Sequence, residues 1–312
     1  MEASLNDQDR PSLPHPLETD SRTTDLSDSG DYPRHLPWIR PAPEVEHEKV
    51  HNLGPYTQVD DSIPMQVWDH LPVRGAFYMV VRKENLVQAR MTLRNLEDRF
   101  NRHKRYPIIV LGNQYYSDKF RKYLSKATES PIYFGKIDPL VWDYPGWIDI
   151  SQAEESMQFM SIYRIPNGDS LAFRQTSRYH AGFFFHHPLF ANVQYTWRIE
   201  PGSVYTCEME TDPFQYMYDH KKVLGFTQSQ KEHQDTMLSL WLFTMEFMKK
   251  SSDLVLPRNE TIMPWMVDES NHYNRCVLLS QFQIVDLSFL RSTAYQKYFA
   301  FLDRKGGFFY ER

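Results

Sequence analysis

The sequence predicts an α/β domain in which a mostly parallel sheet is flanked by helices. Residues 75–81 and 106–111 are short, strongly apolar runs with the length of buried strands. Between them, in residues 85–102, apolar side chains recur at helical spacing. Strands and helices that alternate with short connections indicate parallel pairing. Such a sheet binds ligands at the carboxyl ends of its strands.

The alternation continues along the chain. Further strands are expected at residues 131–134 and 193–199. Further helices are expected at residues 118–126, 234–250 and 292–304. Glu200 follows the last of these strands, and Asp212-Pro213 has the pattern of a helix start, with the aspartate as N-cap. The second half is otherwise less regular than the first and shows no internal repeat.

Composition narrows the class of protein. The chain has 312 residues, of which 41% are hydrophobic, and a formal net charge of −5. Charges of both signs are spread through it, so no nucleic-acid partner is expected. No apolar run is long enough to span a bilayer, and residues 1–30 lack a signal-peptide pattern. The chain as written is therefore expected to be soluble, without a membrane anchor.

The first 70 residues differ from the rest. Nine of the 20 prolines fall in residues 1–64, interleaved with Asp, Ser, Thr and Glu. Such a stretch buries too little apolar surface to offset the entropy lost on ordering. We predict that residues 1–70 are disordered or loosely docked and that the folded domain covers residues 71–312.

Carboxylates and histidines supply the candidate chemistry. Glu200 ends a predicted central strand, where a divalent metal that holds a diphosphate would bind. Taken alone, such a glutamate is more simply a solvated turn residue. Glu208 and Glu210 are expected on an exposed acidic edge. The histidines at positions 180, 186 and 187 match no zinc-binding spacing.

The two cysteines, Cys207 and Cys276, are too few for a disulfide-rich scaffold, and their spacing fits no zinc motif. One bridge between them and two unpaired thiols are both compatible with the sequence.

Six segments carry a more specific signal when they are read together. They are LEDRFN (96–101), YPGWID (144–149), GFFFHHP (182–188), WRIEP (197–201), YNRC (273–276), and YQKYF (295–299) running on to GGFFYER (306–312). In this order and with similar spacing, they resemble the fungal α-1,2-mannosyltransferases of glycosyltransferase family 15. The resemblance covers about residues 73–312.

The resemblance implies a GT-A-like nucleotide-sugar-binding fold and a retaining transfer of mannose from GDP-mannose to mannose-terminated glycans. It also implies a Mn²⁺ ion on the diphosphate, with Glu200 as a ligand, because the departing GDP develops negative charge. Location in the Golgi lumen and association with other mannosyltransferases are further implications. The family's domain continues past the segment that matches residues 306–312, so a domain incomplete at its C-terminus is expected.

Carried over position by position, the resemblance places the family's catalytic carboxylate at Gln283. Tyr179 corresponds to a tyrosine beside the acceptor region, and Phe173 stands where another tyrosine is usual. Arg82, Arg178 and Tyr179 are implied to contact the substrate.

The chain departs from the family pattern where charge matters. The family's Glu-Pro-Asp reads Glu200-Pro201-Gly202, and the amide of Gln283 replaces a carboxylate. An amide is a poor nucleophile and carries no charge. The expected function is therefore α-1,2-mannosyl transfer, with a catalytically impaired relative, or an interaction partner of active family members, as the alternative.

Overall fold

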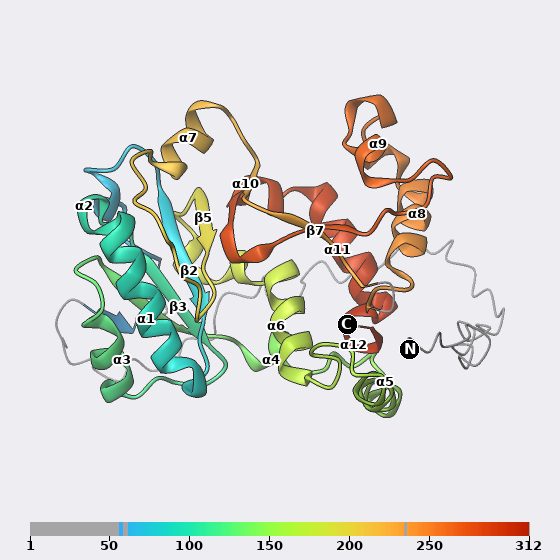
Figure 1. Cartoon of the computed structure of the whole chain (residues 1–312), viewed down its shortest axis with the longest axis horizontal. Coiled ribbons are helices and arrows are strands. Elements are labelled where there is room, and N and C mark those ends of the chain that lie inside the picture. The colour runs from blue at the N-terminus through green and yellow to red at the C-terminus, as the bar shows by residue number, and fades with distance from the viewer. Residues whose placement is uncertain (1–55, 59–61, 234–235, 312) are drawn as a thin grey trace, which may run out of the picture. The chain divides into compact units, whose positions relative to one another are not determined.

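The computed structural model describes residues 56–58, 62–233 and 236–311. Among these residues, seven strands form one sheet in the order β1-β4-β3-β2-β5-β9-β6, and β7 pairs with β8 in a small antiparallel ladder (Figure 1). Neighbours from β1 to β5 are parallel, and β9 runs antiparallel to both its neighbours. This arrangement confirms the predicted mostly parallel sheet. The strands are β1 (Tyr56–Gln58), β2 (Gly75–Val80), β3 (Ile108–Gly112), β4 (Ile132–Lys136), β5 (Tyr195–Arg198), β6 (Leu224–Phe226), β7 (Ser229–Lys231), β8 (Cys276–Leu278) and β9 (Gln283–Asp286).

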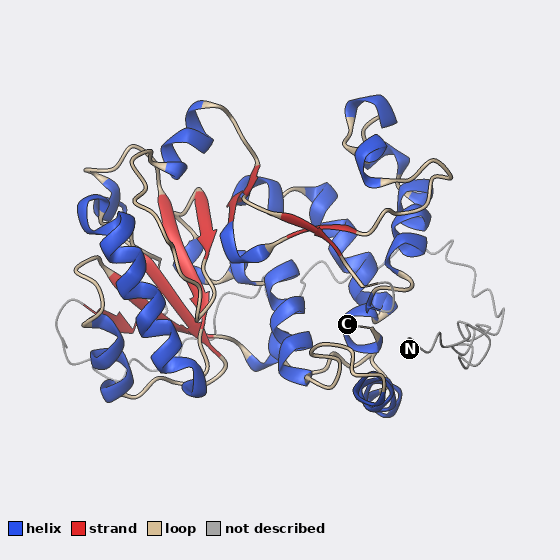
Figure 2. Cartoon of the chain, in the orientation of Figure 1, coloured by secondary structure: helices blue, strands red, loops and turns tan. Residues whose placement is uncertain are grey.

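Helices cover both faces of the sheet, with α1 and α3 on one side and α6 on the other (Figures 1 and 2). No helix within the described ranges is long and apolar enough to cross a bilayer. The helices are α1 (Leu86–Leu96), α2 (Arg102–Lys104), α3 (Asp118–Ser125), α4 (Pro139–Trp142), α5 (Ile150–Ile162), α6 (Leu171–Gly182), α7 (Pro213–Asp219), α8 (Leu240–Lys250), α9 (Met263–Met266), α10 (Leu287–Leu290), α11 (Thr293–Lys305) and α12 (Gly307–Tyr310).

The face of the sheet that α1 covers forms the main apolar core. Phe77 of β2 and Trp197 of β5 are fully buried there, with ring centroids 5.0 Å apart. Leu93 and Leu96 of α1 pack into the same cluster. Continuous apolar strands of this kind are typical of parallel sheets that are covered on both faces.

The predicted Pro-rich segment, residues 1–70, lies largely outside the described residues. Of its described part, Tyr56–Gln58 forms β1 and pairs in parallel with β4. Ile63 and Trp68 are buried, and the Trp68 indole donates a hydrogen bond of 2.8 Å to the carbonyl of Gly75. The end of this segment therefore packs on the domain.

Two predicted helices differ in length from those in the structure. The helix expected at residues 85–102 changes at Glu97–Asn101 into a π-helical turn, where the buried Glu97 accepts hydrogen bonds from Thr128 and the backbone of Glu129. The helix expected at residues 234–250 begins only at Leu240. Ser239 donates its backbone N–H to the carboxylate of Glu311, at 3.0 and 3.2 Å. These tertiary bonds take precedence over the local helical pattern.

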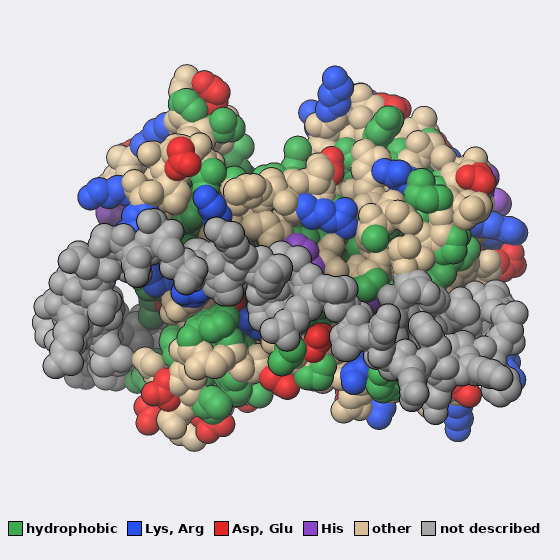
Figure 3. Space-filling model, turned by 180° about the vertical axis from the view of Figure 1, so that it is seen from behind, with side chains coloured by type: hydrophobic (Ala, Val, Ile, Leu, Met, Phe, Trp, Pro, Cys, Tyr) green, Lys and Arg blue, Asp and Glu red, His purple; other side chains and the backbone are tan. Residues whose placement is uncertain are grey.

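A buried ion pair connects α6 to α11. The guanidinium of Arg178 donates to both carboxylate oxygens of Asp303, at 2.7 and 2.8 Å, and to the carbonyl of Val141 at 2.9 Å. Both charged side chains are almost fully buried. On the face shown in Figure 3, by contrast, side chains of both signs are interspersed over the surface of the described residues.

We predict that Asp303→Ala lowers the free energy of unfolding by about 3–5 kcal/mol, because it leaves the Arg178 charge buried without its partner. Urea denaturation followed by circular dichroism measures the change. Asp98→Ala is the matched control, since Asp98 pairs with Arg94 and Arg102 on the exposed surface of the helix. Its effect should stay within about 1 kcal/mol. Equal losses in the two variants would contradict the structural role of the Arg178–Asp303 pair.

Candidate functional site

The order of the strands has a switch point between β2 and β5. From β2 the chain adds β3 and then β4 on one side, and it later adds β5 on the other side of β2. Open α/β sheets bind ligands at such a switch point, outside the carboxyl ends of the strands. Arg82 follows β2 and is exposed, and Glu200 follows β5. Two of the predicted site residues therefore lie at the switch point.

The strand register brings a third predicted residue to the same place. Tyr78 of β2 pairs with Arg198 of β5, and Arg198 pairs in turn with Gln283 of β9. Residues directly opposite each other on neighbouring strands share a face of the sheet. Arg198 also forms an ion pair with Glu200, two residues further along. Gln283, Arg198 and Glu200 therefore lie together at one end of these strands, although Gln283 is far from the other two along the chain.

Tyr78, which lies opposite Arg198 in the sheet, forms a buried polar pair with His180. The hydroxyl of Tyr78 and Nδ1 of His180 on α6 are 2.7 Å apart, and the Tyr78 ring stacks on Phe184 with centroids 4.5 Å apart. Burial, and then the positive charge of Arg198, hold the pKa of His180 well below its ordinary value of 6.5. Burial likewise raises the pKa of Tyr78. His180 is therefore neutral at pH 7.

The loop after β5 is attached to α1 by side-chain hydrogen bonds. The Thr92 hydroxyl accepts from the N–H of Gly202 at 2.9 Å and donates to the carbonyl of Ser203 at 2.9 Å. The Asn95 amide bonds to both backbone groups of Tyr205, at 2.6 and 3.1 Å. Gly202 has a φ of +97°, which favours glycine. These contacts fix the backbone that carries Glu200.

Comparison with known proteins decides the family. The family model described as "Glycolipid 2-alpha-mannosyltransferase" matches residues 43–312. The chain belongs to this family. It is 37% identical over 241 residues to "Glycolipid 2-alpha-mannosyltransferase 2" of Candida albicans, covering 77% of this chain and 52% of the relative. It is 35% identical over 240 residues to "Alpha-1,2 mannosyltransferase KTR1" of Saccharomyces cerevisiae, covering 77% and 61%. The chain thus spans about half to three fifths of the length of these two relatives.

Solved structures of mannosyltransferases have the same fold. Ktr4p of S. cerevisiae, in complex with GDP, is 29% identical, with a TM-score of 0.72 and coverage of 77% of this chain and 64% of that chain. Core-mannan synthase A of Aspergillus fumigatus, in its Mn/GDP form, is also 29% identical, with a TM-score of 0.74 and coverage of 89% and 75%. These similarities confirm the predicted resemblance and the GT-A-like fold.

Glu200 is the carboxylate at the strand edge that could hold the Mn²⁺ ion implied by the mannosyltransferase resemblance, because its Oε1 is buried and, apart from the ion pair with Arg198, has no hydrogen-bond partner among the described residues. Glu200 is ion-paired with Arg198, and the nearby Gln283 and Tyr78 carry no negative charge. Throughout the part of the chain that the structure describes, no three His, Cys, Asp or Glu side chains come together as metal ligands. Mn²⁺ and Mg²⁺ need several oxygen ligands, at least one of them usually a carboxylate free to bind the ion. Glu200 is therefore the side chain at this edge that would hold the ion, as one of several ligands.

Two other predicted substrate residues lie within α6. Tyr179 is almost fully buried, with its ring 5.9 Å from that of Trp142, and burial raises its pKa. Arg178 is engaged with Asp303 and the carbonyl of Val141. Their partners thus lie on α4 and α11, and contact of either side chain with substrate stays a prediction.

The acidic run before α7 has structural roles. Asp212 caps α7 as predicted, since one carboxylate oxygen accepts from the N–H of Phe214 at 3.0 Å and the other from the Tyr106 hydroxyl at 2.9 Å. Glu208 pairs with Arg99 at 2.6 Å on the surface. Neither carboxylate joins Glu200 at the strand edge.

Of the histidines and cysteines that could be metal ligands, His187 has a structural role. His187 caps a short 3₁₀ helix by accepting the N–H of Leu189 at 3.3 Å. Both cysteines are free thiols, Cys207 on the surface and Cys276 half-buried. The structure thus selects the unpaired state from the two alternatives that the sequence left open.

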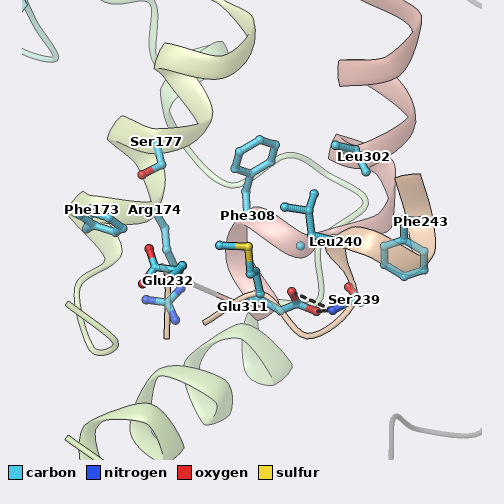
Figure 4. Close-up of a pocket in the computed structure, with 12 residues that line it drawn as sticks. Phe173, Arg174, Ser177, Glu232, Ser239, Leu240, Phe243, Leu302, Phe308 and Glu311 are labelled. Atoms are coloured by element: carbon cyan, nitrogen blue, oxygen red, sulfur yellow. Dashed lines mark hydrogen bonds between the residues drawn. The ribbon is translucent and has the colours of Figure 1, made fainter. Parts of the chain in front are cut away.

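A separate cavity of about 220 Å³ was not predicted from the sequence (Figure 4). Its walls come from α6, α8, α11, α12 and the segment around Glu232, which are far apart along the chain. Its lining residues include Phe173, one of the positions at which the chain departs from the family pattern. The carboxylate of Glu311 lies in its wall, bonded to Ser239, and burial raises the pKa of Glu311. No local pattern could have revealed a cavity assembled from such distant segments.

We predict that Thr92→Val lowers the free energy of unfolding by about 1–3 kcal/mol, because the N–H of Gly202 loses its acceptor. Thr92→Ser is the matched control, since it keeps the hydroxyl and should stay close to wild type. Urea denaturation measures both. If the valine and serine variants are equally stable, the hydroxyl does not hold the loop.

We predict that the free energy of unfolding depends on pH through the buried His180. Because the pKa of His180 is held below 6.5 in the folded chain, the unfolded chain takes up a proton there that the folded chain does not. The contribution of His180 to the free energy of unfolding is therefore fully present above about pH 6.5. Below that value it falls by up to about 1.4 kcal/mol for each pH unit. In His180→Gln this part of the pH dependence should disappear. Urea titrations between about pH 5.5 and 7.5 test it, with the exposed His103→Gln as control. An unchanged slope in His180→Gln would count against the buried neutral histidine.

Proposed function

We propose that this chain binds GDP-mannose at the carboxyl ends of β2 and β5. The observation that carries the proposal is the convergence of Arg82, Arg198 and Gln283 at the switch point of the sheet. Arginine side chains suit a diphosphate because the planar guanidinium donates paired hydrogen bonds to phosphate oxygens. The GDP-bound Ktr4p structure, 29% identical, supports the choice of nucleotide.

The associated reaction is α-1,2-mannosyl transfer to mannose-terminated glycans, in the Golgi lumen. Retention at the anomeric carbon needs a group on the face opposite the leaving GDP that can form or stabilise an oxocarbenium-like species. At Gln283 this group is an amide, which can donate and accept hydrogen bonds but supplies neither a glycosyl ester nor a negative charge. We infer that the chain binds the donor well and transfers mannose slowly.

A second candidate function rests on the same residue. A protein that binds the donor without efficient transfer can act as a non-catalytic partner of other mannosyltransferases. The uncharged Gln283 favours this role over that of an efficient enzyme.

Isothermal titration calorimetry with GDP and GDP-mannose tests donor binding, with ADP as the control nucleotide. We expect both guanine nucleotides to bind, and Arg82→Ala to bind them at least about 10-fold more weakly, as is common when a charged hydrogen bond to phosphate is lost. Absence of binding by the wild-type chain would overturn the proposal.

Transfer is tested with α-methyl mannoside as acceptor in the presence of Mn²⁺. Gln283→Glu should transfer mannose about 100-fold or more faster than wild type, because a charged catalytic group commonly contributes 10²–10⁴-fold. Gln158→Glu, on the exposed surface of α5, is the matched control for the same change of charge. Efficient transfer by wild type would contradict the assignment of slow transfer.

A further inference from the structure

We propose that the outer face of α1 and α3 docks on a bilayer surface that carries anionic headgroups. This contact involves none of the residues proposed to bind the donor, and it does not depend on donor binding.

Positive charge is concentrated along this part of the chain. Residues 86–126, which run from the start of α1 to the end of α3, contain ten Lys and Arg against three Asp and Glu. Their net charge is +7, in a chain whose net charge is −5. Just before α1, Glu84 adds a negative charge that Lys83 offsets. Charges that are mixed over the whole sequence are therefore segregated here, and such a surface attracts an anionic partner.

The two helices form one continuous surface. They lie side by side on the same face of the sheet (Figure 1), where Arg90 on α1 donates to the carbonyl of Tyr123 on α3 at 2.7 Å. The Arg90 guanidinium also lies over the Tyr123 ring, 4.7 Å from its centroid. The helices are thus fixed relative to each other, and their outward side chains can meet one flat partner together.

Acidic side chains neutralise only part of this positive charge. Six of the ten basic side chains form ion pairs, namely Arg94, Arg99, Arg102, Lys104, Arg105 and Arg121. Their acidic partners are Asp98, Asp118, Glu129, Glu208 and Asp212. Within the described residues, those without an acidic partner are Arg90, Lys119, Lys122 and Lys126. The three lysines are spaced so that they project from one side of α3.

Apolar side chains stand among these charges on α1. Val87 and Met91 are 57% and 65% exposed, and they lie four residues apart on one side of the helix. Large apolar side chains that project from a basic surface can enter the boundary between headgroups and acyl chains, while lysines bind the headgroups. An acidic protein would be attracted by the charge alone. The exposed apolar pair therefore favours a lipid surface.

The experiment is co-sedimentation of the full 312-residue chain with two kinds of vesicle. One is phosphatidylcholine alone, and the other contains phosphatidylcholine and phosphatidylserine in equal amounts. We expect binding to the anionic vesicles, weakened by added salt, and little binding to the neutral ones.

A pair of double variants tests the lysines of α3. Lys119→Gln/Lys122→Gln should bind anionic vesicles at least about 10-fold more weakly, since each basic residue at such a surface contributes about 5-fold. Lys249→Gln/Lys297→Gln is the matched control, because both lysines are exposed on α8 and α11. The control should bind like wild type, and circular dichroism verifies that each variant is folded.

A second pair tests the apolar side chains. Val87→Ser/Met91→Ser should bind anionic vesicles about 5-fold more weakly or worse, because less apolar surface is buried. Leu140→Ser/Ile162→Ser is its control, with both side chains strongly exposed on α4 and α5. This control should bind like wild type.

The outcomes decide the assignment. Absence of binding to anionic vesicles at low salt would overturn the proposal, as would equal losses in a test variant and its control. Unchanged binding by Val87→Ser/Met91→Ser would also overturn it. Binding of poly-glutamate without binding of vesicles would assign the face to an acidic protein instead. GDP titration of Lys119→Gln/Lys122→Gln should match wild type, so failure of membrane docking leaves the donor proposal untouched.

Discussion

Strands β2 and β5 lie side by side and parallel at the point where the strand order reverses, and the candidate site depends on this pairing. The register sets Tyr78 opposite Arg198, and β9 then continues the row to Gln283. On the other face, the same register buries Phe77 against Trp197. A slip of one residue would exchange the two faces of a strand, so the apolar core and the polar row are fixed together.

The core around Trp197 opposes such a slip. Its indole lies 5.0 Å from the ring of Phe77 and 4.2 Å from that of Phe282, which precedes β9. One fully buried side chain thus contacts both strands that flank β5. From α1, Thr92 and Asn95 hold the loop that follows β5. The edge of the sheet is therefore organised before a ligand binds, which reduces the entropy lost on binding.

The sequence predicted the parallel part of the sheet well because each buried strand is a short apolar run between helical segments. Glu200 was recognisable for the same reason, as the first carboxylate after such a run. The position of Gln283 opposite Arg198 was not, because antiparallel pairing with a strand 85 positions later leaves no local pattern (283 − 198 = 85). Only the resemblance to a family singled out Gln283. The sequence also could not reveal that Arg178 pairs with Asp303 and His180 with Tyr78, because these partners lie 125 and 102 positions away along the chain.

Under the proposed function, binding and transfer place different demands on this end of the strands. Binding a diphosphate needs positive potential and a fixed backbone, which arise from strand pairing, the switch point and two arginines. Transfer needs, in addition, a group of suitable charge at one position opposite the leaving GDP. Strand pairing is made by backbone atoms, so the exchange of a carboxylate for the amide of Gln283 leaves the pairing with Arg198 in place. A single side chain can therefore remove mannosyl transfer while diphosphate binding persists, because the fold and the chemistry of a site depend on different atoms.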